Sequence, residues 1–523
     1  MKKRMEGFLG FGGVRISRRV FAGMVALAFV FLLSASSVWA QIAPQAAPLN
    51  PKFLDYMAQR EAARLAGQPF PASQGDQFRT GYIPSPIDFS YLRVSYLRVS
   101  AAEAAAGAVA IPLPSSFDLR KTNKVSPVRD QGNCGSCWAF GSLASVESHI
   151  MPTVTDFSPQ FIMDTHGFNA GPCAGGNENM AMANLVQYGA ISESEDPYQY
   201  WWPDEYMPAT SSAWTHAVVP TVKVIAAGVS GGTPITAYIK NALYNDKTAV
   251  AIGFYIIQNP PYLQVASNKD VTYYSNGVTT GGDGHEVAIV GWNDNYPASN
   301  FGIVPPGNGA YLVKNSWGAW WGNSGYFWMS YYEPSVNPNA YVFFADASPS
   351  PYTWQYQLDP LGWVTSAGYP GSTTAWMANV FKGSPRGRVI RAVSFYTVDP
   401  NTEYTVQIYD KCPDGNPSGG KLLTTQSGTF ATAGYNTVNL KTPVTVSLGT
   451  SADVNFSVVV ELTDTIGSDY PIAVSAPVSG YSDRFNMASG RTYMSLDGTS
   501  GSWLDVSGYG PWAACLKAFG TTH

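Results

Sequence analysis

The chain has 523 residues, of which 45% are apolar and 13% are charged, and its formal net charge at pH 7 is −5. A chain of this length and apolar content can bury more than one hydrophobic core, so about two or three domains are expected. No basic run occurs after residue 19, which argues against a partner such as nucleic acid.

Residues 1–40 have the pattern of an export signal. Basic residues up to Arg19 precede an apolar run from Val20 to Leu33, and the small-residue stretch 38–40 offers a cleavage site. The apolar run is shorter than a membrane-spanning helix needs, although an uncleaved anchor stays open. Residues 17–21 also resemble a bacterial twin-arginine signal. We therefore expect a secreted, periplasmic or cell-surface protein.

Residues 41–112 are rich in Ala, Pro and Gln, and their periodicity supports only one helix, from Pro51 to Ala66. The sequence Ser-Tyr-Leu-Arg-Val occurs twice in tandem over 90–99, and an Ala-rich run follows over 101–110. We expect both stretches to be accessible, which predicts cleavage on maturation between about residues 95 and 115. The residues alone indicate a spacer.

The stretch 131–140 has the pattern of a reactive-cysteine site. Apolar residues recur at three- and four-residue steps after Cys137, which predicts a helix to about Ile150. Cys137 then lies in the first turn, where free N–H groups and the helix dipole stabilise a thiolate. The pair Cys134 and Cys137 also fits a redox site, half a zinc site, a disulfide or two buried thiols. No second Cys pair or paired His follows, which disfavours zinc.

A thiol with a pKa near 8.5 needs a base to act as a nucleophile at neutral pH. His285 alone among the five histidines stands at a predicted strand start, beside the glycines at 281 and 282. The other histidines lie near a helix end, in polar connections or at the terminus: His149, His166, His216 and His523. A helix is predicted over 177–188. Strands are predicted over 249–255, 286–292 and 310–314.

Residues 350–520 show alternation of apolar and polar residues, as in Tyr404 to Ile408 and Val454 to Leu462. Turn-forming residues separate these runs, so an all-β sandwich is predicted.

Four stretches, in this order, resemble the papain family of cysteine peptidases. They are Cys134–Trp138, with the family's Cys-Gly-Ser-Cys-Trp signature, then Cys173–Gly176, Gly284–Trp292 and Lys314–Tyr326. Residues 113–120 resemble the start of the mature domain.

The resemblance implies an α+β fold with two lobes, which we place at 113–346. It also implies that 41–112 is a propeptide covering the cleft, although a linker stays open. Residues 350–520 resemble the lectin-like β-sandwich of jelly-roll type found in some bacterial and archaeal members.

The resemblance makes Cys137 the nucleophile and His285 its base. Asn315 would orient His285, and Trp317 would shield their hydrogen bond and border the substrate. The Gln131 amide and the N–H of Cys137 would bind the oxyanion. Asn315 lies further from the nucleophile than is usual in the family, and we attribute the excess to loop sequence over 293–308.

Substrate contacts are also implied. Gly175 and Gly176 would pair with an extended substrate backbone. Glu178 and Glu286 would border the pocket for the side chain two places before the scissile bond. Two carboxylates there would favour Lys or Arg. The alternative is that Glu286 points into solvent or a salt bridge.

The resemblance pairs Cys134 with Cys173. Cys412 and Cys515 are expected to form a second disulfide, which would leave only Cys137 free.

These residues predict an exported cysteine endopeptidase that acts on protein or peptide substrates without a metal or cofactor. A monomer is expected. The alternative is an adhesion or binding protein on an inactive papain-like scaffold. The C-terminal region would either bind a glycan or cell-surface ligand or brace the catalytic lobes.

Overall fold

The computed structural model describes residues 42–68, 78–105, 112–153, 156–199, 218–346, 350–383, 388–447 and 455–521. The predicted export signal, His216 and His523 lie outside these ranges. No helix within them is long and apolar enough to cross a membrane. From Pro44 onward the chain forms a single unit.

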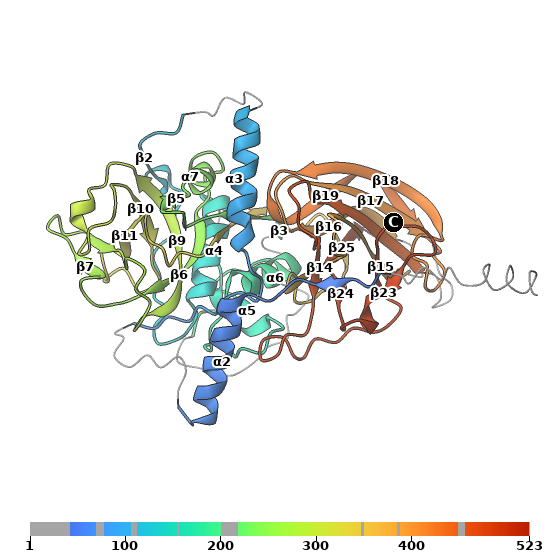
Figure 1. The fold of residues 1–523 in the computed structure, drawn as a ribbon, viewed down its shortest axis with the longest axis horizontal. Helices are drawn as coiled ribbons and strands as arrows, with labels where there is room; N and C mark the ends of the chain where they lie inside the picture. Colours follow the sequence, from blue (N-terminus) through green and yellow to red (C-terminus); the bar gives the residue numbers. More distant parts are fainter. Residues whose placement is uncertain are drawn as a thin grey trace, which may run out of the picture. The chain divides into compact units, whose positions relative to one another are not determined.

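Helices and a sheet together build the chain between 113 and 346 (Figure 1). The helices are α4 (Cys137–Ile150), α5 (Pro159–Thr165), α6 (Glu178–Tyr188) and α7 (Ala237–Tyr244). The strands are β2 (Ser116–Asp118), β3 (Val218–Ala226), β4 (Val229–Ser230), β5 (Thr233–Pro234), β6 (Val250–Ile256), β7 (Leu263–Val265), β8 (Val271–Tyr273), β9 (Asp283–Asn293), β10 (Ala310–Lys314), β11 (Tyr326–Ser330) and β12 (Asn339–Asp346). The helices and strands predicted for this region are confirmed.

Helix α4 is buried along almost its whole length because α5 and α6 cover it on one side and β9 and β12 on another. Its polar residues are therefore buried too, and they need partners. Ser145 bonds to the carbonyl of Ala249 at 2.6 Å. Glu147 accepts a hydrogen bond from the N–H of Phe157 at 3.0 Å. These bonds fix the helix that carries Cys137 at its first position.

The chain from 354 to 521 is almost entirely strands. They are β13 (Trp354–Tyr356), β14 (Thr365–Gly368), β15 (Thr374–Lys382), β16 (Arg388–Thr397), β17 (Thr402–Asp410), β18 (Lys421–Phe430), β19 (Ala433–Val446), β20 (Asn455–Thr463), β21 (Ile472–Ser475), β22 (Thr492–Ser495), β23 (Leu504–Asp505), β24 (Ala513–Ala514) and β25 (Leu516–Thr521).

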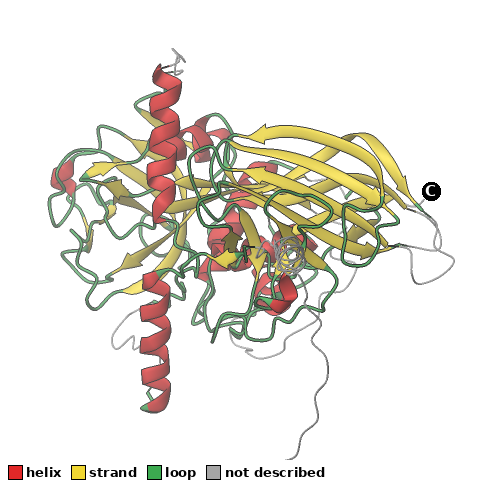
Figure 2. Ribbon diagram, turned by 45° about the vertical axis from the view of Figure 1, so that its right-hand side comes forward, coloured by secondary structure: helices red, strands yellow, loops and turns green. Residues whose placement is uncertain are grey.

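Two of the resulting sheets form a sandwich, which Figure 2 shows as the long strands. One sheet has the order β18-β17-β20-β15-β22-β23, and the other contains β13-β25-β16-β19. The alternate residues that the sequence pattern places inside, such as Val406 and Val460, are buried in the core between them with Phe395. The predicted sandwich is confirmed. A third small sheet, β1-β14-β21-β24, includes β1 (Gln45–Ala46) from the front of the chain.

The sandwich and the 113–346 region share one sheet. Strand β19 pairs with β3, so the order runs β13-β25-β16-β19-β3-β12-β6-β9-β10-β11-β8-β7 without a break. At this junction Gly434 has a φ of 125°, and a Cβ there would lie 1.9 Å from the carbonyl oxygen of Val222. Only glycine allows the strands to meet in this way.

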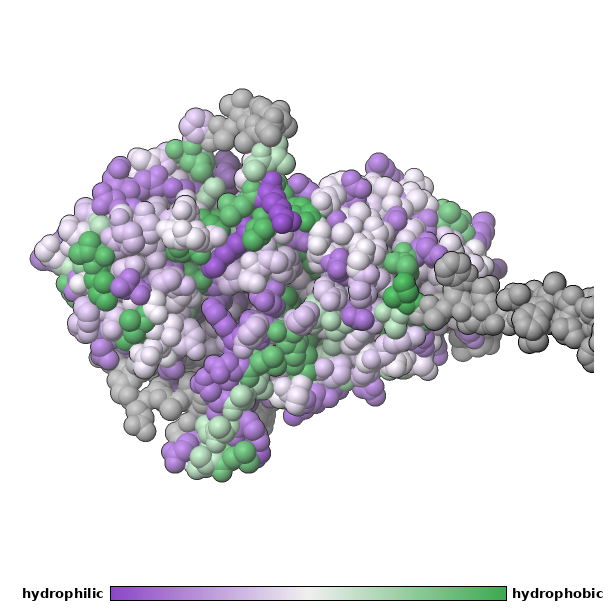
Figure 3. Space-filling model, viewed as in Figure 1, coloured by the Kyte–Doolittle hydropathy of each residue, from purple (hydrophilic) through white to green (hydrophobic). Residues whose placement is uncertain are grey.

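The tandem copies over 90–99 form helix α3 (Ser90–Ala105) and are not an accessible spacer. Leu92, Tyr96 and Val99 recur at steps of three and four and are buried. Helix α2 (Pro51–Leu65) is confirmed and buries Phe53. The expectation that the two five-residue copies are accessible is wrong for one face of α3, which packs on β3 and β12. On the face drawn in Figure 3, hydrophobic residues form small separate patches.

Tyr96 joins the two regions. Its hydroxyl donates to the carbonyl of Val224 in β3 at 2.7 Å and accepts from the N–H of Ala433 in β19 at 3.2 Å. We expect Tyr96→Phe to lower the free energy of unfolding by about 1–3 kcal/mol, because two buried groups lose a partner. Leu97→Ala, at an exposed position of the same helix, is the matched control and should change it by less than about 0.5 kcal/mol. Equal urea midpoints for the two full-length variants would contradict this.

Candidate active site

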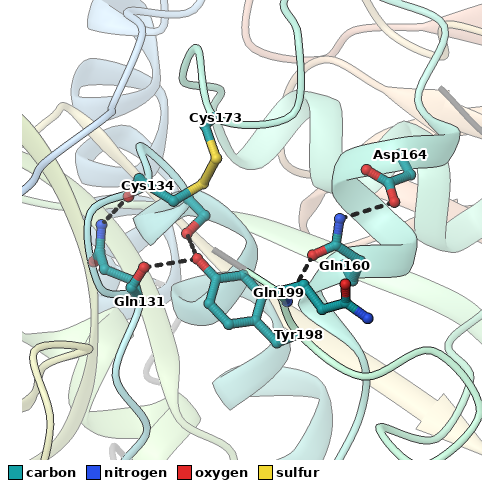
Figure 4. Close-up of a disulfide and its surroundings, with 8 residues drawn as sticks. Gln131, Cys134, Gln160, Asp164, Cys173, Tyr198 and Gln199 are labelled. Carbon is teal, nitrogen blue, oxygen red and sulfur yellow. Dashed lines mark hydrogen bonds between the residues drawn. A yellow bond between two sulfur atoms is a disulfide. The ribbon is translucent and has the colours of Figure 1, made fainter. Parts of the chain in front are cut away.

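Cys137 is the first residue of α4 and is fully buried. The preceding turn is held by a disulfide between Cys134 and Cys173, which Figure 4 shows beside the site. The N–H of Gly135 also donates to the carbonyl of Cys173 at 3.2 Å. A Cβ at Gly135 would lie 2.7 Å from that carbonyl oxygen. The disulfide and the small residue therefore bring the turn close to the 173–176 loop.

His285 lies in β9 and meets Asn315, which directly follows β10. The ring Nε2 lies 2.8 Å from Asn315 Oδ1, and the N–H of Ser316 also donates to this oxygen at 2.8 Å. Asn315 Oδ1 can only accept hydrogen bonds, so His285 Nε2 must be the donor. The neutral ring therefore carries its proton on Nε2. Nδ1 then has a free lone pair, and it has no hydrogen-bond partner among the described residues. His285 is thus set to accept a proton at Nδ1.

The Trp317 ring covers this hydrogen bond. It stacks on the His285 ring with centroids 4.7 Å apart and 22° between the planes. Both residues are buried, so water is kept from the His285–Asn315 pair.

Gln131 is fully buried, and both polar atoms of its side-chain amide form hydrogen bonds. Nε2 donates to the carbonyl of Cys134 at 2.9 Å, and Oε1 accepts from the hydroxyl of Ser316 at 2.6 Å. One amide hydrogen is used and the second is available, which suits a donor to a developing oxyanion.

Tyr198 is a residue that the sequence patterns did not indicate. Its hydroxyl donates to the carbonyl of Gln131 at 2.8 Å (Figure 4). The same hydroxyl lies 2.6 Å from that of Ser136, which directly precedes Cys137. Its ring packs edge-on against Phe140 of α4, with centroids 4.9 Å apart. A lone tyrosine in a connecting segment carries no signal of such a role, because only the fold brings it to Gln131.

Residues 78–83, which we call the covering segment, lie across the site. The Phe78 ring stacks on Trp317 with centroids 4.9 Å apart, and the Trp317 indole N–H donates to the carbonyl of Arg79 at 2.9 Å. The N–H of Tyr82 donates to the carbonyl of Gly284 at 3.0 Å, beside His285.

The covering segment also pairs with the glycine loop. The N–H of Gly176 donates to the carbonyl of Gly81 at 2.9 Å, and that of Ile83 donates to the carbonyl of Gly176 at 2.7 Å. The resulting bridge between Tyr82 and Gly176 is parallel. The backbone groups of Gly176 are therefore occupied. A Cβ at Gly175 would lie 2.7 Å from the Gly81 carbonyl oxygen, so this glycine is also needed for the close approach.

This cover has an electrostatic consequence. Burial raises the pKa of the Cys137 thiol far above its usual value, against the opposing effect of a hydrogen bond from the backbone of Glu286. Burial also lowers the pKa of His285 to about 4, against the opposing effect of its bond to Asn315. Both groups are neutral near pH 7 in this covered state.

Glu178 and Glu286 are fully buried. Glu286 accepts from the hydroxyl of Ser142 at 3.0 Å through Oε1, and its Oε2 has no partner among the described residues. Burial raises the pKa of Glu178 to about 7, and burial and the charge of Glu178 raise that of Glu286 well above its usual value. The alternative in which Glu286 faces solvent or forms a salt bridge is wrong.

The predicted second disulfide is also wrong. Cys412 and Cys515 are buried free thiols. Cys412 follows β17 and packs with Trp503, whereas Cys515 precedes β25 and lies in the large core with Ala473. The two belong to different core clusters, so three thiols are free among the described cysteines, and not one.

Two other histidines have structural partners. His149 Nδ1 lies 2.9 Å from the hydroxyl of Thr248, and His166 Nδ1 accepts from the N–H of Phe168 at 3.2 Å. The described residues contain no cluster of His, Cys, Asp and Glu suited to a metal ion.

Comparison with known proteins agrees with this geometry. Residues 113–341 match the papain family cysteine proteases, and residues 355–520 match the lectin like domain. Mouse (Mus musculus) cathepsin K is 31% identical over 224 residues, which cover 41% of this chain and 59% of that protein. Thiol protease SEN102 of Hemerocallis sp. is 30% identical over 291 residues, covering 54% of this chain and 72% of that protein.

Solved structures show the same pair of domains. The cysteine protease and lectin-like domains of Cwp84, a surface layer associated protein of Clostridium difficile, align with a TM-score of 0.70 at 20% identity, covering 92% of this chain and 98% of that one. Cwp84 after propeptide cleavage aligns with a TM-score of 0.64 at 22% identity, covering 78% and 100%. The protein belongs to the papain family of cysteine peptidases. Within that family it combines the peptidase domain with a lectin-like domain.

We expect Tyr198→Phe to lower kcat/KM of the processed protein about tenfold, because Gln131 loses a bond that positions it. The expected loss is in kcat with little change in KM, since the oxyanion contact predicted for Gln131 would be made in the transition state. Tyr188→Phe, on the adjacent helix α6, serves as a control. An unchanged kcat in Tyr198→Phe would show that Gln131 does not depend on this hydroxyl.

Proposed function

We propose that this protein is an exported cysteine endopeptidase made as an inactive precursor. The bond from His285 to Asn315 supports this most directly, because it leaves Nδ1 with a lone pair, and the Cys137 thiol lies at the backbone of the next residue, Glu286. An inactive scaffold would have no need for this fixed tautomer.

In the proposed reaction, His285 takes the thiol proton at Nδ1, and the sulfur of Cys137 attacks the carbonyl carbon of the scissile bond. The N–H of Cys137 and the free amide hydrogen of Gln131 stabilise the oxyanion. His285 returns the proton to the leaving amine as the C–N bond breaks and a thioester forms. Water, deprotonated by His285, then hydrolyses the thioester and frees Cys137.

The precursor is inactive in this proposal because the covering segment occupies the backbone sites that a substrate needs. It also desolvates the thiol and the imidazole, which favours their neutral forms over the ion pair. Removing the segment would let water and substrate stabilise the thiolate and imidazolium.

The export signal over 1–40 stays a prediction, and so does a secreted or cell-surface location. For the C-terminal domain, the continuous pairing of β19 with β3 supports the bracing role. A glycan ligand and a monomeric state also stay predictions.

Iodoacetamide should label Cys137 in the full-length protein at pH 7 at least about a hundredfold more slowly than in processed protein, because thiolate, not thiol, reacts. Peptide mapping by mass spectrometry gives the rate at each thiol. A Cys137→Ser variant measures the background at Cys412 and Cys515. Processed protein that is neither labelled at Cys137 nor active on a peptide library would refute the proposed function.

Cleavage on maturation was expected between residues 95 and 115. Because Tyr96 and Val99 are buried in α3, we now expect the new N-terminus between residues 101 and 115, and activity should rise as it appears. N-terminal sequencing of the secreted protein gives the position. Fully active protein that begins at Gln41 would contradict the precursor model.

A further inference from the structure

The side chain of Tyr82 fills a pocket next to the active site. Its backbone pairs with Gly176 and Gly284, while its ring enters the structure and is only 8% exposed. A Cβ at Gly253 of β6 would lie 2.6 Å from two carbons of the ring. Any side chain at residue 253 would therefore close the space that the ring occupies.

The walls of the pocket come from facing elements. In the sheet, Gly253 of β6 is directly opposite Glu286 of β9. Because Gly253 has no side chain, space remains beside the Glu286 carboxylate. On the helical side, a Cβ at Gly141 of α4 would lie 2.9 Å from Glu286. Glycines thus make room for both the carboxylate and the ring.

The tip of the ring meets polar groups. Asn337 Nδ2 donates to the Tyr82 hydroxyl at 2.6 Å. The hydroxyl hydrogen then remains to be donated, and the Glu178 carboxylate interacts with this hydroxyl. This interaction is not a well-formed hydrogen bond, since neither carboxylate oxygen of Glu178 has a hydrogen-bond partner among the described residues.

We propose that this pocket is the one in which the processed enzyme selects its substrate, and that Glu178, Glu286 and Asn337 make it prefer tyrosine two places before the scissile bond. This inference rests on the proposed peptidase function. It assigns to Tyr82 the role of a substrate mimic that is displaced on maturation.

The hydrogen-bonding pattern decides between tyrosine and the basic side chains expected from the sequence. A phenol hydroxyl accepts from Asn337 and donates to a carboxylate, whereas an ammonium or guanidinium only donates and would leave the Asn337 donor unpaired. Neither buried carboxylate forms an ion pair with a described residue, and burial and the charge of Glu178 raise the pKa of Glu286 well above its usual value, so the two do not both ionise near neutral pH. Phenylalanine would fill the space but leave the Asn337 donor without its acceptor and Glu178 without a neighbouring hydroxyl.

The test compares two fluorogenic substrates on processed enzyme, benzyloxycarbonyl-Tyr-Arg-aminomethylcoumarin and its Phe-Arg counterpart, with a Lys-Arg substrate as the third. We expect kcat/KM for Tyr to exceed that for Phe and for Lys by at least about tenfold. The ratio is measured within one preparation, so a variant with a smaller folded fraction does not bias it. Glu178→Leu should bring the Tyr-to-Phe ratio close to one. Glu178→Gln, which keeps an acceptor oxygen, should restore part of it.

Active enzyme with a Tyr-to-Phe ratio near one, or with a preference for Lys, would overturn this inference and leave the peptidase function intact. Protein that cleaves none of the three and is not labelled at Cys137 would overturn both.

The full-length chain gives a second readout that needs no activity. Tyr82→Phe should speed iodoacetamide labelling of Cys137 in the uncleaved protein about tenfold, because the covering segment is held less tightly. Tyr91→Phe is the matched control, since its hydroxyl bonds to the carbonyl of Val398 and not to a residue of the pocket. Equal labelling in the two variants would show that the Tyr82 hydroxyl has no favourable contact in the pocket.

Discussion

Close backbone contact between the covering segment and the active-site glycines sets the chemical state of the whole site. A Cβ at Gly81 would lie 2.4 Å from the carbonyl oxygen of Gly135, and one at Gly284 would lie 2.7 Å from that of Tyr82. Side chains there would hold the segment away from the loops. Because the chains do meet, water is excluded, and the Cys137 thiol and His285 imidazole are both neutral.

Trp317 has two partners in this arrangement. The Trp317 ring stacks on the ring of His285 and also on the ring of Phe78. The residue that shields the imidazole therefore also binds the covering segment. Aromatic stacking of this kind adds roughly 0.5–1.5 kcal/mol per pair beyond the area buried. The same ring would be exposed to substrate once Phe78 is gone, which makes shielding and substrate contact two uses of one side chain.

The C-terminal domain contributes to the catalytic region through its backbone. Strand β3 pairs with β12 along one edge, and its other edge would be unpaired if β19 did not cover it. Helix α3 packs on the same strand, and Tyr96 bonds to both β3 and β19. Separate domains were expected from the sequence, but the sheet and part of the core are common to both. Their relative position is therefore fixed by hydrogen bonds and packing, and not by a linker.

The chemistry of the site could be predicted from local sequence. Helix periodicity places Cys137 at a helix start and an apolar run places His285 at a strand start, whereas the part of Asn315 came from the resemblance of its segment to the papain family. For the same reason, helix α2 and the alternating strands β17 and β20 were predicted nearly at their observed bounds.

Only the tertiary structure decided which distant residues meet. Nothing local distinguishes Tyr198 or Tyr82 from other tyrosines, and the face of α3 that carries Leu92 and Tyr96 is buried only because β3 and β12 lie against it. The predicted disulfide between Cys412 and Cys515 was wrong for a related reason. A count of cysteines carries no information on where each one lies in the fold. The burial of Glu286 likewise depends on glycines at 141 and 253, far from it in sequence, because space for a side chain is a property of the neighbouring elements.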